Sequence, residues 1–146
     1  MALTRKKAKG RGGSPPFFQL YHKLLDSPRY INLPHTAKSL LIDMVRQYNG
    51  KNNGDICVTL TVMKKRGWNS NSSMRRALSA LINAGLILLT RQGSINKCSL
   101  YAFSWLPIDE CNGKLEVNAT ITPPIPLSIE KLTEPTYLKK AKPIPS

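Results

Sequence analysis

The chain has 146 residues, with 22 lysines and arginines against eight aspartates and glutamates, and its formal net charge is +14. Because no apolar run approaches the roughly 18 residues of a membrane-spanning helix and no apolar segment follows the basic N-terminus, we expect neither a membrane protein nor a secreted precursor. The cysteines Cys57, Cys98 and Cys111 are far apart in sequence and form no CxxC pair or zinc spacing, so we expect reduced thiols in a cytoplasmic chain.

The positive charge is concentrated in the first part of the chain. Residues 1–105 contain 17 of the basic residues and only three acidic ones, whereas residues 106–146 contain five of each. A sustained positive field of this kind attracts phosphate polymers through counterion release. We therefore expect a nucleic-acid partner, although an acidic protein or an anionic lipid surface would also satisfy this charge.

Residues 1–16 form the first of three expected parts, a disordered basic arm. The segment has too few apolar side chains to offset the entropy lost on ordering. We expect the arm to strengthen attachment to a polyanion electrostatically, and a solvated tail that only aids solubility is the alternative. Its basic residues are Arg5, Lys6, Lys7, Lys9 and Arg11.

The central part, residues 17–108, carries the periodic signals of one folded domain. One apolar stripe predicts a short helix over 17–25, which the serine-proline pair at 27–28 ends. A second stripe with helical spacing covers residues 34–48 and predicts the best-defined helix of the chain.

A turn at 52–55 and a short β-prone run at 56–58 lead into two further helices. Thr59 or Thr61 can cap the first of these helices, which ends at Gly67. The second begins within residues 69–72 and stops at Gly85. Its predicted buried face consists of Met74, Ala77, Leu78, Leu81 and Ile82.

The predicted domain ends in a β-hairpin, with strands over 86–91 and 98–105 and a turn over 92–97. Three aromatic residues alternate along the second strand, and we expect them to pack in the core rather than to stack on bases. These are Tyr101, Phe103 and Trp105. Trp68 follows the turn between the two helices, and we expect its side chain to pack between these helices.

This order of helices, strand and hairpin resembles the winged helix-turn-helix proteins found among bacterial transcription regulators and replication initiators of plasmids and phages. The resemblance covers residues 33–105 and rests on the strand-helix-turn-helix run that ends Asn83-Ala84-Gly85-Leu86-Ile87. It implies an α+β, mainly α fold with a C-terminal hairpin wing, a second helix in the DNA major groove, and a wing on the backbone or minor groove. Regulators of the MarR type add long terminal helices for dimerisation, whereas the C-terminal tail of this chain is proline-rich, so the oligomeric state stays open.

The candidate DNA-contacting residues fall into three groups. The expected recognition helix presents Asn69, Asn71, Ser72, Arg75, Arg76 and Ser79. The helix before it presents Lys64, Lys65 and Arg66, which we expect to hold phosphates, and the wing presents Arg91, Gln92, Asn96 and Lys97. Arginine can bind guanine bidentately and asparagine can read adenine. No acidic residue occurs from position 57 to position 108, which favours DNA contact over an ordinary solvated face.

Residues 109–146 contain six prolines and no sustained periodicity, so we expect a mostly disordered, proline-rich tail. Such a tail could dock a protein partner or act as a linker. The sequence offers no means of choosing between these roles.

The sequence thus predicts a sequence-preferring double-stranded DNA-binding protein of the cytoplasm or nucleoid, acting as a transcriptional regulator or DNA-associated accessory factor. We expect no enzyme, cofactor or metal, because His22 and His35 have no triad or ligand spacing around them and no phosphate-binding glycine loop occurs. Two alternatives stay open. One is a replication-initiator-like domain that recruits a partner through its tail, and the other is an RNA- or protein-binding winged helix.

Overall fold

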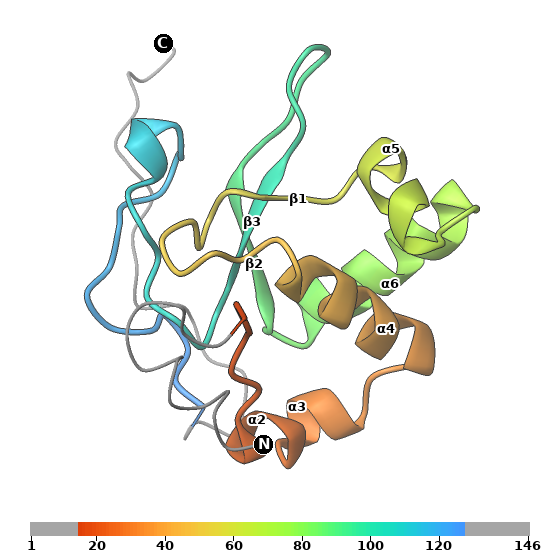
Figure 1. Ribbon diagram of the computed structural model, residues 1–146, viewed down its shortest axis with the longest axis horizontal. Coiled ribbons are helices and arrows are strands. Elements are labelled where there is room, and N and C mark those ends of the chain that lie inside the picture. Colours follow the sequence, from red (N-terminus) through yellow and green to blue (C-terminus); the bar gives the residue numbers. More distant parts are fainter. Residues whose placement is uncertain (1–14, 128–146) are drawn as a thin grey trace, which may run out of the picture.

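A computed structural model describes residues 15–127 as an α+β fold with a small antiparallel sheet. Helices α4 and α6 cover one face of this sheet, and the chain after the last strand covers the other (Figure 1). The expected basic arm, apart from its last two residues, and the last 19 residues of the expected tail lie outside the described residues. In the part of the chain that is described, no helix has the length and apolar character needed to cross a membrane.

The elements follow one another in an order close to the predicted one. They are α2 (His22–Leu25), α3 (Pro28–Ile31), α4 (His35–Val45), β1 (Ile56–Cys57), α5 (Leu60–Met63), the 3₁₀ helix η2 (Lys64–Arg66), α6 (Asn71–Asn83), β2 (Ile87–Arg91), β3 (Leu100–Phe103) and the 3₁₀ helix η3 (Cys111–Gly113). The sheet order is β1-β3-β2, and both pairings are antiparallel.

The N-terminal part differs from the single helix predicted over 17–25. Two short helices form, α2 and α3, and residues 17–21 lead into α2 without helical structure. Ser27 caps α3, because its hydroxyl accepts a hydrogen bond from the Arg29 N–H and Pro28 occupies the first turn. The serine-proline pair therefore starts a helix as well as ending one.

Helices α4 and α6 pack on each other through the apolar stripes that the sequence predicts. The buried residues of α4 are Ala37, Leu40, Leu41, Met44 and Val45, and those of α6 are Met74, Ala77, Leu78 and Leu81. Ile82 was also expected on the buried face, but it is 39% exposed. It lies at the edge of the α6 stripe, where a helix turns from its packed face to its open one.

Strand β3 is buried on both faces, which explains why its own four residues are all apolar or aromatic. Tyr101, Phe103 and Trp105 point into the core formed with the helices, as predicted. Leu100 and Ala102 point the other way and belong to a second apolar cluster. A strand in this position has no polar face, because neither side meets water.

The second cluster is completed by residues that the sequence assigned to the tail, so the domain boundary expected at residue 108 is wrong. Leu115 and Val117 pack on the outer face of β3, and Ile125 is 1% exposed. The segment after β3 forms no regular strand, and its apolar residues have no periodic spacing. Isolated hydrogen bonds hold it to the sheet instead of a ladder of strand pairing. The N–H of Glu116 donates to the carbonyl oxygen of Thr90 in β2, and the N–H of Ile125 donates to that of Ser104, which follows β3.

The fully buried Asn53 side chain joins β1, β3 and the segment that follows. Its Oδ1 accepts from the Phe103 N–H at 2.7 Å, and its Nδ2 lies 3.1, 3.2 and 2.8 Å from the carbonyl oxygens of Phe103, Leu106 and Pro107. Its backbone N–H donates to the Asp109 carboxylate at 2.8 Å. One amide therefore satisfies several buried backbone groups at once.

We expect Asn53→Ala to lower the free energy of unfolding by about 3 kcal/mol, because the substitution leaves buried backbone donors and acceptors without partners. Urea denaturation followed by circular dichroism measures the loss. The control is Asn118→Ala, at an exposed position of the segment that covers the outer face of β3 (residues 108–125, the covering segment). Its free energy of unfolding should stay within about 0.5 kcal/mol of the parent value. Equal stability of the two variants would contradict the role given to Asn53.

Candidate functional site

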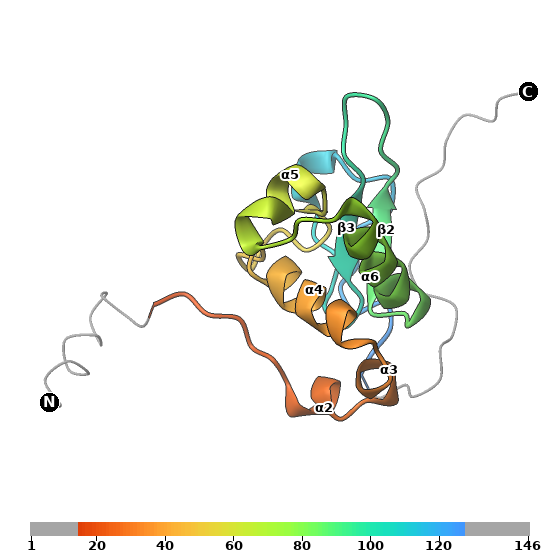
Figure 2. The same ribbon diagram turned by 90° about the vertical axis from the view of Figure 1, so that its right-hand side faces the viewer.

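A groove with a volume of about 640 Å³ lies between α6 and the β2-β3 hairpin. The hairpin projects from the body of the fold next to α5 and α6 (Figures 1 and 2). The α6 side contributes Asn71, Met74, Arg75, Leu78, Ser79 and Ile82, and the hairpin contributes Gln92, Gly93, Ser94, Lys97, Cys98, Ser99 and Tyr101. The rest of the lining is Val58, Thr59 and Leu60, at the start of α5. The groove thus has two cations and no acidic residue in its lining.

Local capping sets the relative position of α5 and α6. The Thr59 hydroxyl accepts from the Val62 N–H at 3.3 Å and caps α5, and the Ser70 hydroxyl accepts from the Ser73 N–H at 3.2 Å and caps α6. Gly67 ends η2 with a φ of 98°, in the left-handed region that favours glycine. Thr59 is one of the two caps that the sequence allows, Ser70 lies within the range 69–72 in which the sequence starts the second helix, and Gly67 is the predicted stop.

The six residues expected on the recognition helix are all exposed. Asn69 precedes α6, and the other five lie within it. The two arginines face different sides of the helix, since consecutive helical residues are about 100° apart. Arg75 lines the groove, and both arginines border a second hollow that continues to Pro34 at the start of α4.

The basic residues of η2 are exposed as expected, but Arg66 has an acidic neighbour. Its Nε lies 3.5 Å from Oδ1 of Asp43 on α4. The other carboxylate oxygen of Asp43 accepts a 2.7 Å hydrogen bond from the Trp68 indole N–H. Trp68 is half-buried against the core, so the predicted packing role is confirmed. Lys64 and Lys65 are the cations of this helix that carry no ion pair.

The hairpin exposes fewer of its polar side chains than the sequence suggests. Gln92, Asn96 and Lys97 are exposed, but Arg91 is half-buried and its guanidinium donates to the Cys98 carbonyl at 2.8 Å. Arg91 therefore ties the two sides of the hairpin together at its base, and it is not the exposed wing cation that the sequence suggested. Lys97 is the cation nearest the tip.

Tyr101 contributes a neutral hydroxyl to the groove. Burial raises the pKa of its phenol, and a hydrogen bond from Ser99 and the charge of Arg75 act in the opposite direction. A phenol that stays protonated at neutral pH can both donate and accept a hydrogen bond.

The histidines considered for catalysis lie apart, His22 in α2 and His35 at the start of α4. Within residues 15–127, no group of three or more histidines, cysteines or carboxylates could hold a metal ion. One contact that the sequence reading missed joins the sulfur atoms of Cys57 and Cys98. Their separation of 41 residues gave no spacing signal that could have revealed it.

No family model, curated protein or solved structure matches the chain. The function is therefore argued from the exposed α6 face, the adjoining groove and their charges.

We expect Asp43→Ala to lower the free energy of unfolding by about 1–2 kcal/mol, because the buried end of the Trp68 indole loses a charged acceptor. Asp43→Asn should lose less, since its amide oxygen can still accept the hydrogen bond. Thermal unfolding followed by tryptophan fluorescence compares the two. Asp26→Ala, at an exposed acidic position, is the control, and a loss of the same size there would contradict the assignment.

Proposed function

We propose that the chain is a sequence-preferring double-stranded DNA-binding protein of the winged helix-turn-helix type, acting as a transcriptional regulator or a DNA-associated accessory factor. In this proposal α6 is the recognition helix and the β2-β3 hairpin is the wing. The observation that carries the proposal is the exposed outer face of α6, which contains two arginines, polar residues and no acid, beside a groove whose other wall is the hairpin.

The order of elements supports the winged type. Helix α4, strand β1, the α5-α6 pair and the hairpin follow one another, and the sheet order β1-β3-β2 places the hairpin next to the strand that precedes α5. The 13 residues of α6 span roughly 20 Å at 1.5 Å per residue. The major groove of DNA, about 12 Å wide, admits one helix of this kind.

The described carboxylates support the choice of this face. Asp109, Glu110 and Glu116 belong to the segment that covers the sheet on the side away from α4 and α6, and Asp55 pairs with Lys114 of the same segment at 3.0 Å. Asp55, Asp109 and Glu110 thus lie away from the outer face of α6, whereas Asp43 lies beside η2 and Glu116 reaches the Gln92 N–H of the hairpin. A phosphate backbone approaching α6 meets cations first.

We expect Arg75→Ala and Arg76→Ala each to cost roughly 1–3 kcal/mol of binding free energy at a site selected from random duplex DNA. Because the two side chains leave α6 in different directions, each substitution should relax the preference at a different base pair. Binding of the parent and variants to the selected site and to its single-base changes, at stated salt, measures both effects. Lys23→Ala on α2 removes the same charge elsewhere and should change neither preference.

Equal affinity of the Arg75→Ala, Arg76→Ala double variant and the parent for the selected site would overturn the assignment of α6. A preference for structured RNA over duplex DNA in direct competition at physiological salt would overturn the choice of nucleic acid. A recovered palindrome would indicate a two-fold dimer and a single motif a monomer.

For Lys64→Ala we expect weaker binding to all duplexes alike, because a phosphate contact carries no sequence information. The slope of log affinity against log salt should fall by about one unit. Titrations at several salt concentrations with the selected and a scrambled duplex measure the slope. A loss confined to the selected duplex would place Lys64 at a base and not at a phosphate.

A further inference from the structure

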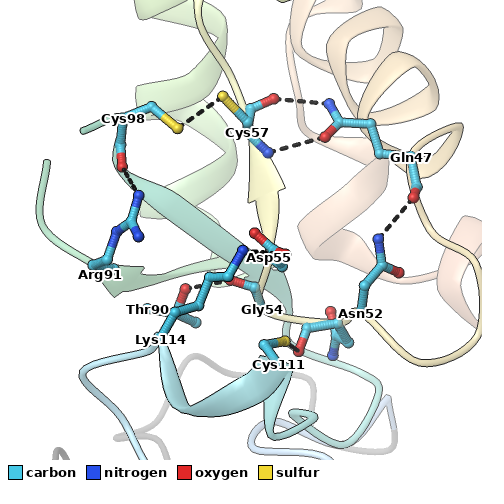
Figure 3. Close-up of polar contacts among 11 residues, drawn as sticks. Gln47, Asn52, Gly54, Asp55, Cys57, Thr90, Arg91, Cys98, Cys111 and Lys114 are labelled. Atoms are coloured by element: carbon cyan, nitrogen blue, oxygen red, sulfur yellow. Dashed lines mark hydrogen bonds and ion pairs between the residues drawn. The ribbon is translucent and has the colours of Figure 1, made fainter. Parts of the chain in front are cut away.

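Two cysteines from distant parts of the sequence meet at the base of the hairpin. The sulfur atoms of Cys57, the last residue of β1, and Cys98, just before β3, lie 3.0 Å apart (Figure 3). Cys57 pairs with Leu100 in the sheet register, and Cys98 precedes Leu100 by two residues in the chain that enters β3. The two thiols are therefore in direct contact, whereas Cys111 contacts the Asn53 carbonyl at 3.7 Å.

Hydrogen bonds hold both cysteines by their backbones. The Gln47 side chain donates to the Cys57 carbonyl at 2.7 Å and accepts from the Cys57 N–H at 3.0 Å, and the Cys98 carbonyl accepts from Arg91 (Figure 3). Gln47 is held in turn through its own carbonyl, which accepts from Asn52 Nδ2 at 2.9 Å. The backbones of Cys57 and Cys98 are thus held by hydrogen bonds that do not involve the two sulfur atoms.

We propose that Cys57 and Cys98 form a site of oxidative modification that closes to an intramolecular disulfide between β1 and the base of the hairpin. The co-reactant is a hydroperoxide. Cys98 is the thiol that meets it, because Cys98 lines the groove and Cys57 does not. Cys57 is the resolving thiol.

The chemistry balances with one peroxide per disulfide. The Cys98 thiolate attacks a peroxide oxygen, the O–O bond breaks, and the products are the Cys98 sulfenic acid and one molecule of water after protonation. The Cys57 sulfur then attacks the sulfenic sulfur, the S–S bond forms, the S–O bond breaks, and the hydroxide leaves with the thiol proton as a second water. Two thiols are oxidised and one hydrogen peroxide is reduced to two waters.

The environment of Cys57 makes the second step slow at neutral pH. The pKa of the Cys57 thiol is raised to about 11 in total. Burial, the hydrogen bond with Cys98 and the charge of Asp55 raise this pKa, and a hydrogen bond with Thr59 lowers it in part. A neutral thiol is a weaker nucleophile than its thiolate, so the attack on the sulfenic acid is slowed. The pair persists as thiols until an oxidant has reacted with Cys98, because contact between two thiols forms no bond unless two electrons are removed. The site therefore responds to peroxide and does not close merely because the sulfur atoms touch.

The test treats the full reduced chain with hydrogen peroxide and follows its intact mass and its peptide map without reductant. We expect the mass to fall by two hydrogen atoms and the peptides containing Cys57 and Cys98 to be linked. Cys111→Ser should close at the same rate, and Cys98→Ser should not close. In the Cys111→Ser background, oxidation should raise the midpoint of thermal unfolding by several degrees, because the cross-link restricts the unfolded chain.

Three outcomes would overturn the proposal. These are a link that involves Cys111, a cross-link between two chains, and conversion of Cys98 to the sulfinic acid with no link to Cys57. The Cys111→Ser variant retains both cysteines of the pair and decides the question even if Cys98→Ser folds poorly. Reversal of the link by dithiothreitol, with return of the thermal midpoint to its reduced value, distinguishes a disulfide from other damage.

Discussion

The position of the candidate groove depends on one buried amide. Strand β1 pairs with β3 through two residues only, which is too short a ladder to hold the chain that enters α5. Asn53, just before β1, adds hydrogen bonds to the end of β3 and to the link after it. An asparagine suits this place because a single side chain supplies both donors and an acceptor. Asn53 thereby joins the turn before β1, from which the chain leads to α5, to the end of β3.

Local signals were sufficient to predict the elements around the groove. The caps Thr59 and Ser70, the stop at Gly67 and the apolar stripes of α4 and α6 are all short-range features, and the structure has them where the sequence indicates. The segment after β3 could not be read in this way. Its burial depends on a few apolar side chains at irregular spacing, and their partners lie on the outer face of a strand far away in sequence.

The charges around the candidate site also depend on contacts between residues far apart in sequence, which local patterns do not reveal. A chain that lacks acids from position 57 to position 108 still acquires acidic neighbours by folding, because Asp43 reaches η2 and Glu116 accepts a hydrogen bond from the Gln92 N–H at the hairpin. Folding also makes Arg91 less accessible, because its guanidinium donates a hydrogen bond to the Cys98 carbonyl across the hairpin. The outer face of α6 is exposed as the periodicity of its apolar residues predicts.

The covering segment has a consequence for how the chain is made. Gly54, with a φ of 124°, lies so close to this segment that an added Cβ would be 2.6 Å from Leu115 Cδ1, so the turn before β1 and the residues around position 115 are shaped to each other. A ribosome releases the helices and the hairpin before it releases Leu115 and Val117, which pack on the outer side of β3. Until then the outer side of β3 is uncovered, and the nascent protein carries an apolar strand face that only the last-made part of the fold can shield.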